Sequence, residues 1–186
     1  TDAAPGKILH DSRGGALANL GVVPFRHYYG TIDATPLFVA LAGAYLERTG
    51  DLATIRALAP ALWRALDWTR QHGDRDGDGL LEYARRREDG LVNQGWKDSD
   101  DSVFHADGRL AEGPIALVEV QGYALAAFRA GAAIAEALGD AGRARDCHAA
   151  AEAMAERIED AFWDDALSFP ALALDGDKRR CAVRAS

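Results

Sequence analysis

Apolar and polar positions follow two alternating patterns along the chain, and the pair of patterns occurs twice. Residues 37–46 are apolar on every side, which is typical of a helix that is buried all round. After Gly50, residues 51–73 carry a polar stripe opposite an apolar face, and its members recur at helical spacing. This order predicts a helical hairpin whose two helices lie near residues 35–49 and 52–72.

The second pair repeats the first. Residues 115–138 are almost entirely apolar, Gly139 and Asp140 repeat the punctuation seen at Gly50, and residues 141–163 again carry one polar stripe. A two-layer ring of helical hairpins requires a buried helix to alternate with an outer one. A plain four-helix bundle would more naturally contain four amphipathic helices. We therefore expect an all-α fold with helices near 115–138 and 141–163 as its second hairpin.

The segments outside the helices predict loops and one small β-hairpin. Residues 1–34 are rich in glycine and are expected to be mostly loop. Asp33 or Thr35 is expected to cap the first helix, and Pro60 to kink the second. Near the C-terminus, short apolar runs flank an Asp-Gly turn in the sequence ALALDGDKRRCAV, a pattern that predicts a β-hairpin.

Composition narrows the classes of partner. Nearly half of the residues are hydrophobic, so the chain is expected to fold, and its net charge of −8 argues against nucleic acid or an anionic membrane as a partner. No stretch reaches the length of about 18 to 20 apolar residues that a membrane span needs. Cys147 and Cys181 do not form a disulfide framework and are interpreted as reduced thiols, which favours a cytoplasmic location.

The sequence NQGWKDSDDS, residues 93–102, combines a tryptophan with a cluster of carboxylates. A solvated loop has no use for the tryptophan, whereas a carbohydrate site uses both, because sugars stack on aromatic rings and their hydroxyls bind carboxylates. The predicted helix order places this loop at one end of the ring, beside the entrances of the buried helices. The following side chains are predicted to gather there: Tyr28, Tyr29, Asp33, Trp96, Asp98, Asp100, Asp101, Glu119, Gln121 and Tyr123.

Asp98 is the candidate general acid of this group. Glycosidic cleavage needs one protonated carboxyl on the leaving oxygen and a second carboxylate for water or for nucleophilic attack. Asp100 and Asp101 compete for the same role, and an aspartate that caps a turn is the simpler alternative for Asp98. Glu119 and Gln121 are polar groups on an otherwise apolar helix, so each needs either a partner in the protein or a ligand.

A second acidic cluster precedes this loop. Asp74, Asp76, Asp78 and the glycine that follows match the first six positions of a calcium-binding loop, D-x-D-x-D-G. The twelfth position, which should be glutamate, is Arg85, although Glu82 stands at the ninth. We therefore expect a structural Ca²⁺ bound by Asp74, Asp76, Asp78 and Glu82, with a remote carboxylate such as Glu119 completing the cage. The alternative is an ordinary Asp/Gly-rich turn.

Four motifs in order resemble one family of enzymes. The segments YYGTIDATPLFVALAGAYLERTGD, DRDGDGLLEY, NQGWKDSDDS and EVQGYALAA resemble the amylo-alpha-1,6-glucosidase, or glycogen-debranching-type, six-hairpin glycoside hydrolases. The resemblance covers nearly the whole chain. It implies an (α/α)6 toroid, inverting hydrolysis of glucosidic bonds, no cofactor for catalysis, and Asp98 as the general acid. It also implies a glutamate base further along the chain, and no motif before Ser186 supplies one.

The resemblance leads to specific expectations about extent and partners. Residues 1–186 are expected to be the N-terminal portion of the catalytic barrel, and inactive alone, because two hairpins cannot close a ring. The apolar helix faces are expected to meet either the remainder of a longer chain or another copy of this one. The expected substrate is an oligo- or polysaccharide.

Two other interpretations remain open at this level. The chain could be a non-catalytic α-helical module that binds carbohydrate or protein, and a base in the parent chain would exclude this. The sequence DSDDS could also be the Mg²⁺–diphosphate motif of a terpene-cyclase-like enzyme. That chemistry needs a second metal motif, which the sequence lacks, and it leaves Trp96 unexplained.

Overall fold

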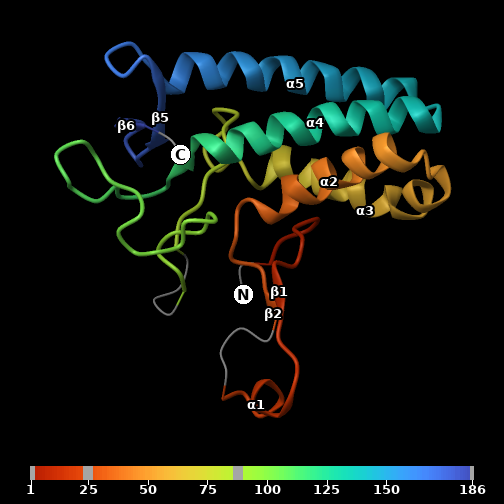
Figure 1. Ribbon diagram of the computed structural model, residues 1–186, viewed down its shortest axis with the longest axis horizontal. Helices are drawn as coiled ribbons and strands as arrows, with labels where there is room; N and C mark the ends of the chain where they lie inside the picture. The colour runs from red at the N-terminus through yellow and green to blue at the C-terminus, as the bar shows by residue number, and fades with distance from the viewer. Residues whose placement is uncertain (1–2, 23–26, 86–89, 185–186) are drawn as a thin grey trace.

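Two helical hairpins form the body of the molecule (Figure 1). The computed structural model describes residues 3–22, 27–85 and 90–184. Helix α4 lies in the middle, with α5 packed on one side and α2 and α3 on the other. The predicted order of two hairpins is confirmed, with boundaries that shift by at most three residues. The long helices are α2 (Ala34–Thr49), α3 (Leu52–Gln71), α4 (Val118–Leu138) and α5 (Ala141–Phe162).

Short local signals set the turn inside each hairpin. Gly50 and Gly139 end α2 and α4 in the left-handed conformation, with φ of 66° and 80°, which glycine adopts without strain. Asp51 then caps α3 by accepting a hydrogen bond from the Thr54 backbone N–H at 3.1 Å. Asp140 caps α5 in the same way. The repeated Gly-Asp pair therefore marks the end of one helix and the start of the next, at the positions that the sequence predicts.

Details of the helix starts differ from the predictions. Asp33 stands at the start of α2, but its side chain makes no capping hydrogen bond, and the Thr35 hydroxyl accepts from the Ile8 N–H at 3.0 Å instead. Helix α4 begins at Val118 rather than near 115, because the preceding residues form strand β3 (Ala116–Leu117) and pair with strand β5 (Phe169–Leu174). Helix α3 is continuous across Pro60.

The prediction that residues 37–46 are buried on every side is wrong for this chain. Leu41 is 69% exposed and Leu37 is 40% exposed. On the side facing α4, Gly43 allows close approach, because a Cβ there would lie 2.5 Å from the Cβ of Ala130. Among the described residues, the other side of α2 has no covering element. The apolar pattern thus specifies two packing faces, of which one has a partner here.

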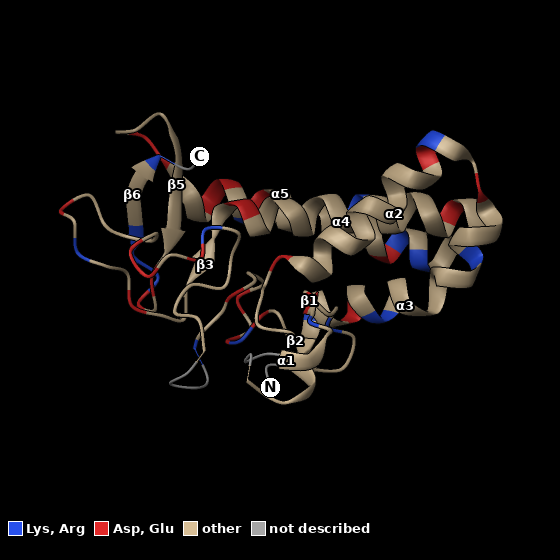
Figure 2. Cartoon of the chain, turned by 60° about the horizontal axis from the view of Figure 1, so that its bottom comes forward, with Lys and Arg blue, Asp and Glu red and all other residues tan. Residues whose placement is uncertain are grey.

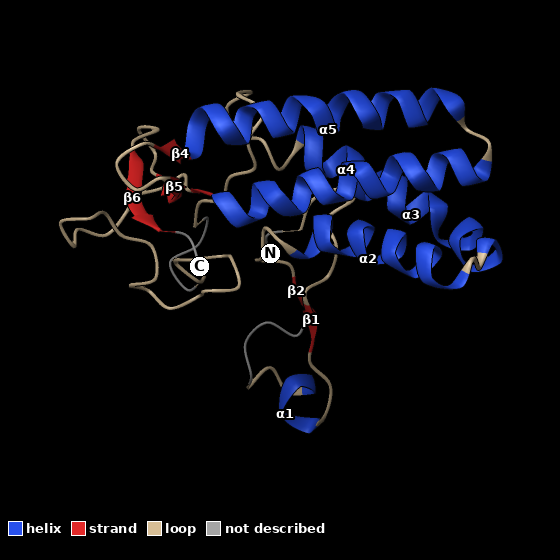
Figure 3. Ribbon diagram, turned by 45° about the horizontal axis from the view of Figure 1, so that its top comes forward, coloured by secondary structure: helices blue, strands red, loops and turns tan. Residues whose placement is uncertain are grey.

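Small sheets lie at the end of the helices where α4 begins and α5 ends (Figure 3). Strands β5 (Phe169–Leu174) and β6 (Arg180–Arg184) form the predicted C-terminal hairpin, with Ala173 opposite Cys181. Strand β5 also pairs with β3 and with β4 (Trp163–Asp164). The N-terminal region contains β1 (Asp11–Ser12), α1 (Ala16–Asn19) and β2 (His27–Tyr28) among loops.

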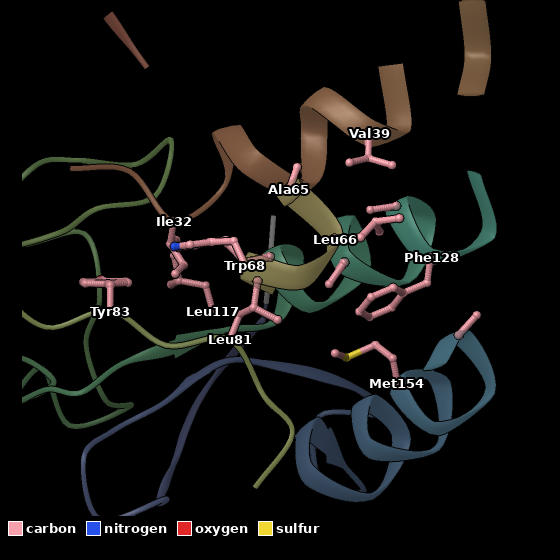
Figure 4. Packing of buried hydrophobic residues seen from close by; sticks show 14 of the residues in the cluster. Ile32, Val39, Ala65, Leu66, Trp68, Leu81, Tyr83, Leu117, Phe128 and Met154 are labelled. Atoms are coloured by element: carbon pink, nitrogen blue, oxygen red, sulfur yellow. The ribbon is translucent and has the colours of Figure 1, made fainter. Parts of the chain in front are cut away.

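The long connection between α3 and α4 contributes to the core. Leu81 and Tyr83 from this connection are buried together with Trp68 of α3 and Leu117 before α4 (Figure 4). Further along, Phe128 of α4 packs in the same cluster. Burial of apolar side chains at these points fixes the connection against the helices.

In the described part of the chain, no helix combines the length and the apolar content that crossing a membrane requires.

Candidate active site

The loop of residues 93–102 is folded onto the starts of the two inner helices, α2 and α4. The Ile32 backbone N–H, just before α2, donates to the carbonyl oxygen of Gln94 at 2.9 Å. A Cβ on Gly95 would lie 2.5 Å from Cδ1 of Leu117, just before α4, so any other residue there would have to displace the Leu117 side chain. The structure therefore brings together three segments that are far apart in the sequence. In Figure 2, where the backbone is red at Asp and Glu, several of the loops outside the long helices carry red segments.

Two side chains that sequence reasoning missed hold the loop in shape. Asn93 is buried, and its Oδ1 accepts from Tyr83 Oη at 2.8 Å while its Nδ2 donates to the Ser99 carbonyl oxygen at 2.7 Å. The Ser102 hydroxyl donates to the carbonyl oxygen of Lys97 at 2.8 Å. These contacts fix the backbone on both sides of Asp98. The only available sequence signal was that both residues stand at the ends of the acidic motif.

Trp96 and Asp98 project from this fixed loop toward solvent. Trp96 is 61% exposed, and the Lys97 ammonium lies 5.3 Å from the centroid of its ring. Asp98, Asp100 and Asp101 are all exposed. Trp96 is therefore not a core residue, and its ring offers an apolar surface beside carboxylates, which is the combination that sugar recognition uses.

One buried and one half-buried carboxyl group, Asp33 and Glu119, lie next to this loop. Asp33 is only 5% exposed, and burial raises its pKa. Burial also raises the pKa of Glu119, the nearby charge of Asp33 adds to this, and the positive charge of Lys97 opposes it. Tyr123 belongs to the same group, since burial and then the charges of Glu119 and Asp33 raise its pKa. The structure thus joins three of the predicted binding residues into one acidic cluster.

This environment predicts a pH-dependent effect of Glu119→Gln on stability. A carboxyl whose pKa is raised by folding destabilises the fold once pH exceeds its ordinary value, so the neutral amide should raise the melting temperature at pH 7 to 8. The gain should disappear below the ordinary glutamate pKa of about 4.3. Thermal melting of both proteins across this range is the measurement, and a gain that is equal at all pH values would contradict it.

Gln121 has a structural role and does not fit the predicted role in substrate binding. Its side chain is completely buried. Its Oε1 accepts from the Leu81 N–H at 2.8 Å, and its Nε2 donates to the carbonyl oxygens of Leu81 and Leu117, both at 2.9 Å. With these bonds made, no polar atom of Gln121 is directed at a ligand. The alternative of a partner within the protein is the correct one.

The aromatic pair before α2 divides between core and surface. Tyr28 is buried and packs edge-on against the His10 ring, with centroids 5.6 Å apart. Tyr29 is half-buried. Only Tyr29 therefore presents part of its side chain to solvent at this position, so it is the better candidate of the two for contact with a sugar.

The predicted calcium loop folds as an Asp-rich turn. Asp74 accepts from the N–H groups of Gly77 and Gly79, and Asp76 and Asp78 each accept from a backbone N–H two residues ahead. Carboxylate oxygens of these three aspartates lie within 4.8 Å of one another. The sequence therefore identifies correctly a cluster of oxygen atoms of the kind that Ca²⁺ prefers.

The fourth predicted ligand, Glu82, is joined to the cluster by a lysine. The Lys178 ammonium lies 2.9 Å from Asp76 Oδ2 and 2.5 Å from Asp78 Oδ2, and it contacts Glu82 Oε1. Glu119, expected to complete the cage, interacts with Asp33 and Lys97 instead. Three of the four predicted ligands, Asp76, Asp78 and Glu82, thus already bind a positive charge through one side-chain oxygen each. Both oxygens of Asp74 accept backbone hydrogen bonds, so the residues as arranged do not fit the metal.

Residues 30–184, well over half of the chain, match the family model described as the mannosylglycerate hydrolase MGH1-like glycoside hydrolase domain. No curated protein matches the chain. The match spans the Trp96–Asp98 loop and the acidic cluster, and it supports a glycoside hydrolase without specifying the glycogen-debranching type. The chain belongs to the family of mannosylglycerate hydrolase MGH1-like glycoside hydrolase domains.

Proposed function

We propose that the loop of residues 93–102 and the starts of α2 and α4 form the acid side of an inverting glycosidase site that acts on glucosidic bonds. The observation that carries the proposal is the exposed Trp96–Asp98 pair on a loop whose backbone is fixed against the helices. Membership of a glycoside hydrolase family supports the class of reaction. The glucosidic and debranching specificity rests on the sequence resemblance.

Asp98 acts in this proposal as the general acid. An exposed carboxyl on a fixed loop can reach the glycosidic oxygen of a bound sugar, and the adjacent Trp96 ring supplies a stacking surface for the sugar face. Asp101 stands on the same loop and binds hydroxyl groups. Because the proposed mechanism is inverting, Asp98 forms no covalent bond to the sugar, and its task is to give a proton to the leaving group.

The cluster of Asp33, which is buried, and of Glu119 and Tyr123, which are half-buried, holds the sugar. Because burial raises the pKa of Asp33 and Glu119, these carboxyls are protonated over a wider pH range than ordinary carboxyls. A protonated carboxyl donates one hydrogen bond and accepts another, which suits the hydroxyl groups of a sugar. Tyr29, at the rim, adds an aromatic contact.

An inverting mechanism needs a second carboxylate about 6.5 to 9.5 Å from the acid, on the opposite face of the sugar. We propose that this base lies outside residues 1–186, in further hairpins of an (α/α)6 toroid. The open apolar face of α2, with Leu37 and Leu41 exposed, is consistent with additional helices at that side. The described residues form four long helices, which make two hairpins, and a six-hairpin ring needs further hairpins.

The test is hydrolysis followed by proton NMR of the first-formed sugar anomer. We expect no turnover of isomaltose, maltose or mannosylglycerate by the 186-residue chain. We expect turnover with inversion of the anomeric centre by a form that includes the complete toroid. Turnover by the chain alone would make Glu119 or Asp33 the base. Retention of configuration would contradict the inverting mechanism.

A further inference from the structure

The turn of the C-terminal hairpin contains a lysine in a backbone conformation that favours glycine. Lys178 has φ of 60°, in the left-handed region that side chains rarely adopt. The turn is otherwise well ordered, because Asp175 accepts from the N–H groups of Asp177 and Arg179 at 3.0 and 2.9 Å. A strained residue persists where the surrounding structure holds it in place, and strain is a reason to look for a task.

The task of Lys178 is visible in its contacts. Asp76 and Asp78 each use one oxygen to close their own loop and direct the other at the Lys178 ammonium. Glu82, whose side chain is only 1% exposed, contributes the third oxygen. These three acceptors match the three N–H donors of an ammonium group. The lysine thus joins the hairpin turn to a loop almost a hundred residues earlier in the chain.

The charges support the same arrangement. Burial by itself lowers the pKa of Lys178, but hydrogen bonds to Asp78, Glu82 and Asp76 outweigh burial and raise it. The hydrogen bond from Lys178 is the main reason that the pKa of Asp76 is lowered. Arg157 of α5 lies against Gly79, so a second cation stands beside the same loop.

We propose that Lys178 is the resident cation of the acidic loop of residues 74–82, in the position where the sequence motif predicts a divalent metal. The loop is then ordered by an internal ammonium, and Ca²⁺ is excluded because its ligands are occupied. This inference replaces the expectation of a bound Ca²⁺ and is independent of the proposed reaction.

The proposal has a consequence for the candidate active site. Glu82 is followed by Tyr83, whose hydroxyl donates to Asn93, and Asn93 in turn holds the Ser99 carbonyl oxygen beside Asp98. Tyr83 also pairs with Ile115 through two backbone hydrogen bonds. The contacts of Lys178 with Asp76, Asp78 and Glu82 therefore support Tyr83, which in turn supports the loop of residues 93–102. No separate metal is needed to order this segment.

The experiment compares calcium binding by the wild-type chain and by Lys178→Met after treatment with a chelator. Titration calorimetry of the wild-type chain should show no saturable binding at about 1 mM Ca²⁺, which is at the weak end of protein calcium sites. Lys178→Met leaves the carboxylates without a cation. It should melt about 5 °C lower in chelator, and added Ca²⁺ should restore most of the loss.

Two further variants test whether the Lys178 ammonium, and not positive charge in general or backbone strain, orders the acidic loop of residues 74–82. Arg179→Met removes a neighbouring positive charge whose ion pairs, among the described residues, are with Asp175 and Asp177, and it should gain no response to Ca²⁺. Lys178→Gly relieves the left-handed strain while removing the ammonium, and it should still melt below the wild type. Saturable Ca²⁺ binding by the wild type at or below about 1 mM would overturn the proposal even if no variant folds. Melting of Lys178→Gly at or above the wild-type temperature would also overturn it.

Discussion

Replacing Asp98 with asparagine should reduce turnover of an unactivated glycoside by about 10²- to 10⁴-fold in a form of the protein that contains both carboxylates. Asparagine has nearly the same shape as aspartate but has no proton to give to the leaving oxygen. Asp98 is exposed, and its side chain makes no hydrogen bond with any other residue that the structure describes, so the fold should be unaffected. The melting temperature should therefore equal that of the wild type while kcat falls.

Asp100→Asn is the matched control for this experiment. Asp100 stands two residues away on the same exposed loop and carries the same charge, so its removal has the same general electrostatic effect. We expect its kcat to remain within a factor of about three of the wild type, because an exposed charge that does not transfer the proton changes a barrier by only a fraction of a kcal/mol. Equal losses in the two variants would mean that the cluster acts through its total charge.

Replacing Gln121 with methionine should destabilise the fold by about 2–5 kcal/mol, the largest effect on stability that we expect from a single side chain. Methionine fills a similar volume, so the loss comes from polar groups and not from a cavity. The N–H and the carbonyl of Leu81, and the carbonyl of Leu117, would lose their partners inside the core. Denaturant unfolding gives the free energy directly.

Gly122→Ala is the control for Gln121→Met. Gly122 is the next residue of α4, is exposed, and a Cβ there meets no atom within 4 Å. Alanine is the better helix former by up to about 1 kcal/mol, so this variant should be at least as stable as the wild type. If Gln121→Met also lies within about 0.5 kcal/mol of the wild type, the structural role of Gln121 is wrong.

The helices, the positions of the turns inside the helical hairpins and the C-terminal β-hairpin could be predicted because their causes are local. The alternation of apolar and polar positions reflects which faces of a helix are covered, and Gly-Asp pairs set the ends of the hairpin turns. Asp51 caps α3 and Asp140 caps α5, the helices that directly follow them. The Asp-rich turn of residues 74–80 follows from the same kind of short-range hydrogen bond.

Features that depend on distant partners could not be predicted. A polar residue on an apolar helix indicates either a partner or a ligand but not which one, so the sequence does not reveal that the partner of Gln121 is the Leu81 backbone. The motif that suggests Ca²⁺ gives no sign of Lys178, which comes from another element. The apolar pattern of α2 likewise does not reveal which element covers each face.

The central claim is that Asp98 protonates the leaving group, and the most direct measurement compares Asp98→Asn on a natural glycoside and on the matching glycosyl fluoride. Fluoride departs with little need of an acid, so the two substrates separate proton transfer from binding. The account predicts that activity falls by about 10²- to 10⁴-fold on the glycoside and changes little on the fluoride. Equal losses on both substrates would contradict it and would assign Asp98 to positioning the sugar.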